Sequence, residues 1–286
     1  MTHNLLVTTE WLHEHLDDPN LRIVDIRGHV LPASAPHPHY FNHYDDYVQA
    51  HIPGAVFVDW VKEITDPGDT QFHAQIAKPE RYAAVMSRLG IGPETLVVAY
   101  DDAHSMFAAR LWWSLRYYGH DKVVVLDGGW KKWTAENRPV TADIPVIEPA
   151  EFVAQPRPEL YRSADSVAAG LHRDMTLIDV RTPEEYTGQA SRTQRAGHIP
   201  GAINHPAGKL YNADDTLLSP EALREQFAAN GIDPTTENIV TYCNGGVSAS
   251  FGMLALNLAG INDVALYDGS WKNWSSDDSK PIETGG

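Results

Sequence analysis

Two stretches of the sequence, Leu21-Arg-Ile-Val-Asp-Ile-Arg27 and Met175-Thr-Leu-Ile-Asp-Val-Arg181, share one pattern, a largely apolar run that ends in Asp-x-Arg. Three further pairs of similar blocks follow in the same order: residues 50–55 with 197–202, 89–100 with 230–242, and 125–133 with 266–274. Matched blocks in a conserved order are typical of an internal repeat. The sequence therefore predicts a duplicated domain.

Each copy alternates short apolar runs with amphipathic stretches. The runs at 23–26, 96–100 and 123–126 are bounded by Gly, Pro or Asp and predict buried parallel strands. Apolar residues at helical spacing predict helices over 79–89, 107–118, 219–230 and 248–258. Strands that alternate with helices predict an α/β fold, a parallel sheet with helices on both faces, in each domain.

The length of 286 residues is consistent with two domains. We expect an N-terminal domain over 1–140 and a C-terminal domain over 161–286. Residues 141–160 contain four prolines, which predict an extended linker wrapped over the surface.

Composition excludes several classes of function. A single cysteine rules out an intrachain disulfide, and the N-terminus lacks the positive and apolar regions of a signal peptide. No apolar run approaches the ~18 residues of a membrane span, so we expect a cytoplasmic protein without a membrane partner. The net charge of −16 argues against non-specific nucleic-acid binding, which needs Lys and Arg to replace counterions.

Residues 29–47 are rich in proline, histidine and aromatic residues. We predict a long loop that lines a cleft between the domains. His37-Pro-His39 and His13-Glu-His15 are weak metal-ligand candidates, because no cysteine and no His-Glu-x-x-His spacing supports them. We therefore expect no metal.

The lone cysteine, Cys243, lies in a glycine-containing loop between a predicted strand and a predicted helix. Loop N–H groups and the positive end of a helix dipole favour the thiolate, which is the nucleophilic form. The alternative is a buried cysteine that packs as a small apolar residue.

Taken together, these blocks resemble the tandem-domain rhodanese family, the thiosulfate and 3-mercaptopyruvate sulfurtransferases. Residues 47–58 and 266–274 are similar to its two signatures, except that Asn273 stands where the family usually has Glu. The resemblance implies that Cys243 takes a sulfane sulfur as a persulfide and passes it to cyanide or a thiol. It implies no cofactor, and a thioredoxin-like reductant is a possible partner.

The resemblance also implies a persulfide-binding loop made by the residues after Cys243: Asn244, Gly245, Gly246, Val247, Ser248 and Ala249. We expect Ser248 to cap the following helix or to donate a hydrogen bond into the site. In the first copy, Asp101 aligns with Cys243. Since a carboxylate forms no stable persulfide, the first domain is expected to be catalytically silent.

Substrate contacts are expected from a few further side chains. Arg181, Arg192 and Arg195 are candidates for binding an anionic donor. His73 and Asp59 are carried over from the mercaptopyruvate branch of the family on a loose alignment. His51 and His198 recur in both copies, although only one copy has a cysteine, so we expect them to be structural.

The sulfur donor stays open between thiosulfate and 3-mercaptopyruvate. The uncharged loop after Cys243 is similar to that of the mercaptopyruvate branch, but Glu185 stands where that branch has a substrate-binding Arg. The uncharged loop favours 3-mercaptopyruvate. A cysteine phosphatase is disfavoured because Ala249 replaces the phosphate-binding Arg of its Cys-x5-Arg loop. A non-catalytic sulfur-carrier or regulatory binding module is the other alternative.

Overall fold

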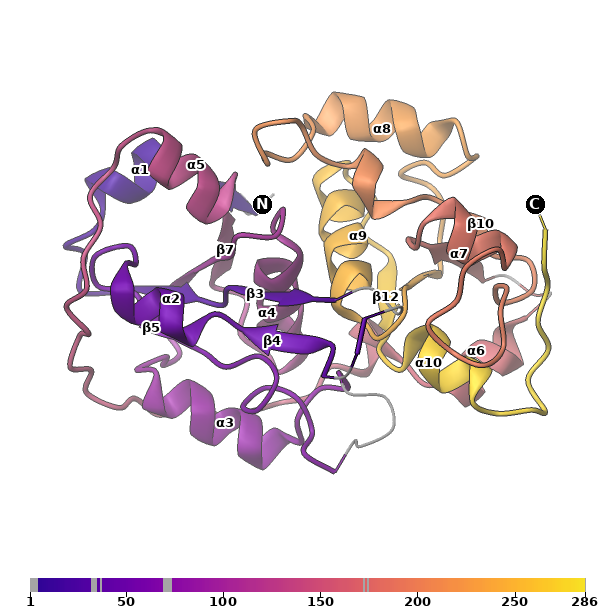
Figure 1. The fold of residues 1–286 in the computed structure, drawn as a ribbon, viewed down its shortest axis with the longest axis horizontal. Coiled ribbons are helices and arrows are strands. Elements are labelled where there is room, and N and C mark those ends of the chain that lie inside the picture. The colour runs from indigo at the N-terminus through magenta and orange to yellow at the C-terminus, as the bar shows by residue number, and fades with distance from the viewer. Residues whose placement is uncertain are drawn as a thin grey trace.

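The computed structural model describes residues 5–31, 35–36, 38–68, 74–171, 173 and 175–285. Two five-stranded sheets, each entirely parallel, form the centres of two domains that lie side by side (Figure 1). The first sheet has the order β1 (Leu6–Val7), β7 (Val123–Leu126), β6 (Leu96–Tyr100), β2 (Leu21–Asp25) and β5 (Val56–Phe57). The second has the order β8 (Tyr161–Arg162), β12 (Val264–Tyr267), β11 (Ile239–Tyr242), β9 (Thr176–Asp179) and β10 (Ile203–Asn204). The two orders are equivalent, so the predicted duplication is confirmed.

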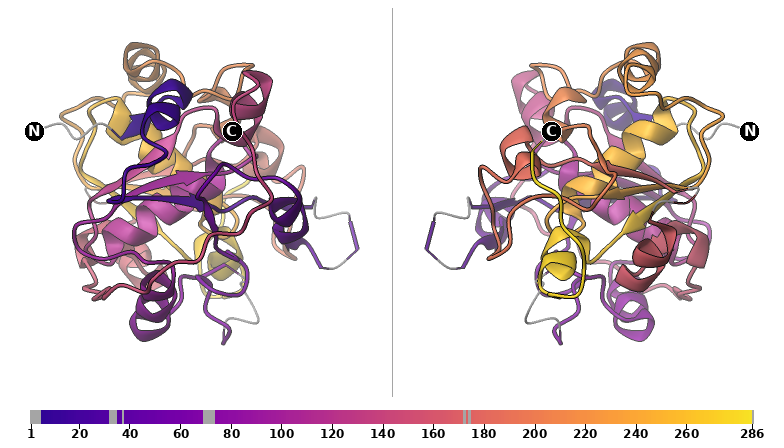
Figure 2. Two further views of the ribbon diagram at one scale, coloured as in Figure 1. Left: turned by 90° about the vertical axis from the view of Figure 1, so that its left-hand side faces the viewer. Right: turned by 90° about the vertical axis from the view of Figure 1, so that its right-hand side faces the viewer.

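Helices flank both sheets, as the end-on views show (Figure 2). In the first domain they are α1 (Thr9–Glu14), α2 (Tyr44–Gln49), α3 (Pro79–Arg88), α4 (Met106–Tyr117) and α5 (Gly129–Ala135). In the second they are α6 (Ala164–Gly170), α7 (Pro183–Thr187), α8 (Pro220–Ala228), α9 (Val247–Leu258) and α10 (Ser270–Ser275), with short 3-10 turns at Pro158–Leu160 and Ala207–Lys209. The four helices predicted from apolar spacing are present to within two residues at each end. Pro79 and Pro220 each open a helix, where the missing N–H costs nothing.

Residues 29–47 are not one long loop. Strands β3 (Gly28–Val30) and β4 (Tyr40–Asn42) pair as an antiparallel ribbon, and α2 begins at Tyr44. Glycine at position 28 permits this ribbon, because a Cβ there would lie 2.5 Å from the carbonyl oxygen of Phe41. His37 lies outside the described residues. The ribbon extends towards the second domain (Figure 1).

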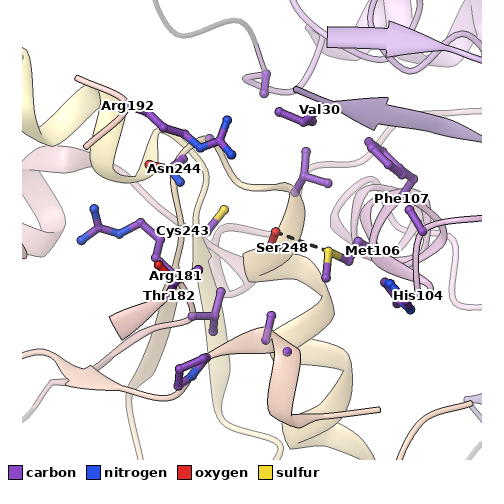
Figure 3. A pocket seen from close by; sticks show the side chains of 18 of the residues that line it. Val30, His104, Met106, Phe107, Arg181, Thr182, Arg192, Cys243, Asn244 and Ser248 are labelled. Atoms are coloured by element: carbon purple, nitrogen blue, oxygen red, sulfur yellow. Dashed lines mark hydrogen bonds between the residues drawn. The ribbon is translucent and has the colours of Figure 1, made fainter. Parts of the chain in front are cut away.

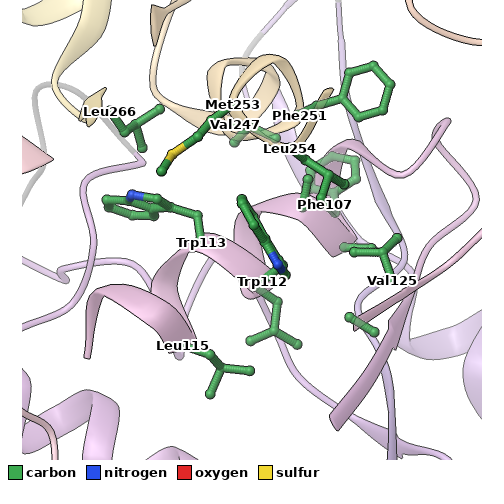
Figure 4. Close-up of a cluster of buried hydrophobic side chains, with 14 of the residues drawn as sticks. Phe107, Trp112, Trp113, Leu115, Val125, Val247, Phe251, Met253, Leu254 and Leu266 are labelled. Atoms are coloured by element: carbon green, nitrogen blue, oxygen red, sulfur yellow. The ribbon is translucent and has the colours of Figure 1, made fainter. Parts of the chain in front are cut away.

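The domains meet through equivalent helices, α4 and α9, which pack against each other. Trp112 and Trp113 of α4 and Met253 and Leu254 of α9 are fully or almost fully buried in one shared apolar cluster (Figure 4). Burial of several large side chains at about 1.5–3 kcal/mol each makes this contact a core that joins the domains.

Two equivalent hydrogen bonds flank the packed helices. Asp127 accepts the N–H of Leu217 at 2.8 Å, and Asp268 accepts the N–H of Ile76 at 2.8 Å. Each carboxylate lies just after the last strand of its own repeat and binds the other domain. The interface therefore has an approximate two-fold relation.

The segment 141–160 follows the first domain before it enters the second. Its backbone N–H groups at Ala150 and Gln155 donate to carbonyl oxygens of Ser87 and Tyr118, and Phe152 is buried. Backbone hydrogen bonds and a buried side chain therefore hold the segment on the first domain. None of the helices in the described part of the chain is both long and apolar enough to span a membrane.

Candidate active site between the two domains

Cys243 follows strand β11 directly and lies four residues before helix α9. Its Sγ accepts the N–H of Gly246 at 3.2 Å, and its own N–H donates to Ser270 Oγ at 3.1 Å. The N–H of Trp271 in turn donates to the Cys243 carbonyl oxygen at 2.9 Å. The Asp-Gly-Ser-Trp block near the C-terminus therefore holds the backbone of Cys243 through two hydrogen bonds, a role that the sequence alone did not reveal.

Gly246 is the residue that lets the loop enter the helix. It has a φ of 84° and is the N-cap of α9. A Cβ at this position would lie 2.7 Å from Asp268 Oδ1 and 3.0 Å from Arg110 Nη1. Both the left-handed backbone and the close approach require glycine here.

Ser248 does not cap α9, so that prediction is wrong. The helix starts at Val247 with Gly246 as its N-cap, which leaves Ser248 as the second helical residue. Its hydroxyl donates to the thioether sulfur of Met106 at 3.6 Å, across the domain boundary (Figure 3). Ser248 nevertheless lines the cavity that contains Cys243.

A cavity of about 510 Å³ opens above Cys243 between the domains. Its volume lies in the range of small-molecule sites. The second domain contributes the loop residues Cys243, Asn244, Gly245, Val247 and Ser248, and also Val180, Arg181, Thr182, Pro183, Arg192, Pro206, Ala207 and Gly208. The first domain contributes His29, Val30, Tyr40, Ala74, Ala103, His104, Met106 and Phe107. Figure 3 shows ten of these residues labelled around the cavity.

Asn244, Glu185 and Arg192 form a hydrogen-bonded group at the side of the cavity. Glu185 Oε1 accepts Asn244 Nδ2 at 2.9 Å and Arg192 Nε at 3.2 Å. Arg192 also donates to the carbonyl oxygen of Leu31 in the first domain at 2.7 Å. Glu185 thus orients an Arg that comes from seven residues further along the chain.

Arg181 lines the cavity, but its guanidinium is already engaged. It forms a buried ion pair with Asp179 at 2.6 Å and donates to the carbonyl oxygen of Gly197 at 2.8 Å. The guanidinium points away from Cys243 in Figure 3. Arg27 and Asp25 form the equivalent pair at 2.8 Å in the first domain. The pairs therefore tie strand ends together in both domains, and the guanidinium of Arg181 is not free to bind a donor as its candidacy required.

The structure does not bring two other candidates to the cavity. Arg195 donates to the carbonyl oxygens of Asp277 and Lys280, and Asp59 accepts Asn42 Nδ2 at 2.7 Å in a separate surface hollow. The expectation that they contact substrate is not met, because their polar atoms serve nearby backbone and side-chain groups. His73 lies outside the described residues.

His51 and His198 are buried and do not line the cavity. Their Nδ1 atoms are hydrogen-bonded to the backbone carbonyls of Tyr47 and Tyr186. This placement agrees with a structural role.

The counterpart loop in the first domain has an anion in place of the thiol. The Asp101 carboxylate accepts four backbone N–H groups, from Ala103, Ser105, Phe107 and Ala108, at 2.7–3.0 Å. Burial raises the pKa of Asp101 to about 6, and the backbone hydrogen bonds oppose that rise. The loop occupies 101–105, one residue more than 243–246, before its helix starts.

The prediction that residues 29–47 line the cleft is met by His29, Val30 and Tyr40, whereas His104, Met106 and Phe107 were missed by sequence reasoning. Nothing in the local pattern marks these three, which reach the cavity from the Asp101 loop (residues 101–105, the silent loop) and from the first turn of α4. Lys272 does not line the cavity, but its ammonium lies 4.4 Å from the ring centre of the cavity residue Tyr40. Burial lowers the pKa of Lys272 to about 8.

Two repeated α/β domains, with a cysteine loop at the end of a central strand of the second, define the class of protein. Comparison with known families identifies that class. The Rhodanese-like domain family matches residues 8–136 and 163–277, and the chain belongs to this family. The chain is 35% identical to the sulfur carrier protein TtuD of Thermus thermophilus, with 98% of this chain and 97% of that protein covered. It is 30% identical to the 3-mercaptopyruvate sulfurtransferase of Escherichia coli, with 99% of both covered.

Solved structures show the same likeness. The crystal structure of SseA, the 3-mercaptopyruvate sulfotransferase of Escherichia coli, superposes with a TM-score of 0.81 at 30% identity, covering 94% of this chain and 99% of that one. A variant of EanB, seen as a cysteine persulfide with ergothioneine, gives 0.83 at 26% identity over 99% of this chain and 71% of that one.

Proposed function

We propose that this protein is a sulfurtransferase that carries sulfane sulfur on Cys243. The observation that carries the proposal is the position of Cys243 Sγ, at the floor of an interdomain cavity, with the N–H of Gly246 donating to it. Thiolate attack on the donor breaks the donor's bond to sulfur and forms a persulfide. An acceptor nucleophile then removes the outer sulfur and restores the thiolate.

The silent loop indicates where the outer sulfur of the persulfide would lie. Asp101 Oδ2 accepts the N–H groups of Phe107 and Ala108, the second and third residues of α4. Their counterparts in α9 are Ser248 and Ala249. These first-turn N–H groups have no partner within the helix, and they would stabilise a negatively charged outer sulfur.

Arg192 is the residue we assign to the anionic end of the donor. It lines the cavity, whereas the other lining Arg, Arg181, is held in a buried ion pair. Glu185 offsets part of the charge of Arg192, which suits the single carboxylate of 3-mercaptopyruvate better than the dianion thiosulfate. Steady-state assays with both donors test this preference, and a higher kcat/KM for thiosulfate would contradict it.

The persulfide itself is tested by intact mass. The wild-type protein incubated with donor should gain the mass of one sulfur atom, and Cys243→Ser should gain none. Cyanide or a thiol should then remove the added sulfur, and a thioredoxin-like reductant is a candidate for the physiological acceptor. If neither donor adds sulfur to the wild-type protein, the proposal is wrong.

A sulfur carrier is a second candidate, because the chain is 35% identical to a protein named as one. A carrier would form the same persulfide but deliver it to a protein acceptor. Persulfide formation without turnover on cyanide or small thiols would favour this function. Both functions are expected in the cytoplasm, where the single cysteine stays reduced.

A further inference from the structure

Three side chains of the first domain form a hydrogen-bonded chain that ends at the cavity. Asp102 Oδ2 lies 2.7 Å from His43 Nδ1, and His43 Nε2 lies 2.7 Å from His29 Nδ1. Asp102 belongs to the silent loop, next to Asp101, and His29 lies on the ribbon and lines the cavity with Cys243. The chain thus connects the silent loop to the shared cavity.

We assign the two hydrogen bonds of this chain a direction, starting from the carboxylate of Asp102. An ionised carboxylate only accepts, so His43 donates from Nδ1 to Asp102. We assign His43 the tautomer with its proton on Nδ1, so that its Nε2 accepts the Nδ1–H of His29. The lone pair on His29 Nε2 therefore remains available as a base.

The surroundings of His29 lower the pKa of its imidazole. Its ring stacks on Phe41, with centroids 4.7 Å apart and planes 10° apart. Although His29 is exposed, partial desolvation and the neighbouring His43 lower its pKa, while Asp102 and Asp46 oppose that change. A neutral imidazole at neutral pH can accept a proton.

We propose that His29 is the general base that deprotonates an acceptor thiol in the second half of the reaction, with His43 and Asp102 as its positioning residues. This inference rests on the proposed persulfide on Cys243. The thiol proton moves to His29 Nε2, and the resulting thiolate bonds to the outer sulfur. The bond between the two sulfurs of the Cys243 persulfide breaks, and its electron pair stays on Cys243 as a thiolate. The proton then passes from His29 to water.

The charge balance of this step explains why the relay would help. A thiolate and a persulfide anion repel each other in a cavity of low polarity. The imidazolium formed on His29 places a positive charge beside them during attack, and Asp102 stabilises that charge through His43. The first domain, which lacks a nucleophile, would then supply the acid–base group of the reaction.

The test is a single-turnover assay on protein already loaded with sulfur, so that persulfide formation is measured first and separately. Acceptor thiols of graded acidity are compared at one pH. For His29→Gln we expect a loss on the order of 100-fold with thiols that are protonated at the assay pH. Thiols that are already ionised should lose about twofold at most, since they need no base.

The positioning residues give a different readout. Asp102→Asn removes the charge that favours imidazolium, so the apparent pKa of the acceptor step should fall. His39→Gln is the matched control, because His39 lies in the same part of the chain, bonded to the carbonyl of Ala35, and does not line the cavity. It should leave all rates unchanged.

Two outcomes would overturn the inference while leaving the persulfide proposal intact. One is an equal loss for ionised and protonated thiols in His29→Gln, which would mean that His29 only shapes the cavity. The other is no loss at all. Failure of the wild-type protein to load sulfur would instead refute the proposed function itself.

Discussion

The two strand–loop–helix units of this protein have the same architecture and opposite chemistry. Trp130 N–H donates to the Asp101 carbonyl oxygen at 2.8 Å in the first, and Trp271 N–H donates to the Cys243 carbonyl oxygen at 2.9 Å in the second. Each helix starts at a left-handed N-cap, Ser105 or Gly246. The fold therefore builds an anion-binding helix N-terminus twice.

What differs is the group that occupies this N-terminus. In the first domain the side chain of Asp101 fills it permanently with four hydrogen bonds. In the second domain the shorter loop places only the Cys243 thiol at the helix N-terminus, where its sulfur accepts one hydrogen bond from the backbone. The Asp101 loop, whose own side chain already binds these four N–H groups, gains stability. The Cys243 loop leaves its N–H groups for a ligand and gains reactivity.

The largest difference between the repeats in the stability cost of a substitution is expected at the two carboxylates that bind the other domain, Asp268 and Asp127. Asp268 and Asp127 each accept one backbone N–H from the other domain, but Asp268 also pairs with Arg110 at 2.6 Å. Both partners of that pair are almost fully buried. Asp268→Asn would leave the Arg110 charge without its anion, at a cost of about 3–5 kcal/mol.

The matched variant is Asp127→Asn, which keeps an oxygen for the N–H of Leu217 and strands no charge. It should cost about 1 kcal/mol. Urea unfolding of both variants measures the two values. Equal losses would show that the Arg110 pair adds nothing to the interface and that the repeats contribute symmetrically.

The second largest difference in stability is expected between substitutions of the two helix N-caps. Gly246→Ala forces a Cβ into 2.7 Å contact with Asp268 and a side chain into a left-handed backbone, at about 3 kcal/mol. Ser105→Gly removes a left-handed non-glycine residue and a buried hydroxyl that lacks a hydrogen-bond partner, so it should lie within about 1 kcal/mol of wild type.

Thermal unfolding of the two N-cap variants, together with persulfide loading, tests this contrast. Gly246→Ala should also lose loading, because its loop carries Cys243. A Gly246→Ala protein with wild-type stability would mean that the loop can move away from Asp268, and the argument from close approach would fail.

Much of this architecture follows from local pattern, and the confirmed parts share that property. The repeat, the strands at 96–100 and 123–126 and the helices starting at Pro79 and Pro220 depend on periodicity and on breaker residues close in sequence. Cys243 was singled out for the same reason, since the strand, the glycines and the helix around it are contiguous.

The parts that escaped prediction depend on contacts between distant segments. Ser248 has the residue type of an N-cap, but Gly246 takes that position because the left-handed turn must come before the helix. Residues 29–47 were expected to line the cleft, but the pairing of 28–30 with 40–42 that brings His29 to the cavity was not predicted. Arg192 faces the cavity because Glu185 and the first-domain carbonyl of Leu31 hold it there. Sequence spacing contains none of these long-range relations.

The smallest expected difference concerns His205, whose counterpart in the first domain is Val58. The two residues occupy equivalent positions, since their N–H groups donate to the carbonyls of Asp179 and Asp25 just after β10 and β5. Both are buried. Burial and the nearby Lys209 lower the pKa of His205 to about 4.

This depressed pKa makes the second domain acid-sensitive at His205. Between pH 6.5 and about 4 the unfolded chain binds a proton at this histidine and the folded protein does not, so stability falls as the pH falls through that window. The loss is about 2 kcal/mol at pH 5. His205→Val copies the first domain and removes the group that titrates. At pH 7.5 the variant should be slightly less stable than wild type, because Asn230 loses its hydrogen bond to the His205 ring. At pH 5 the difference in unfolding free energy between variant and wild type should shift by about 2 kcal/mol in favour of the variant. Urea unfolding of both proteins at the two pH values measures this gain, and a difference that does not change with pH would mean that His205 is protonated, or solvated, in the folded state.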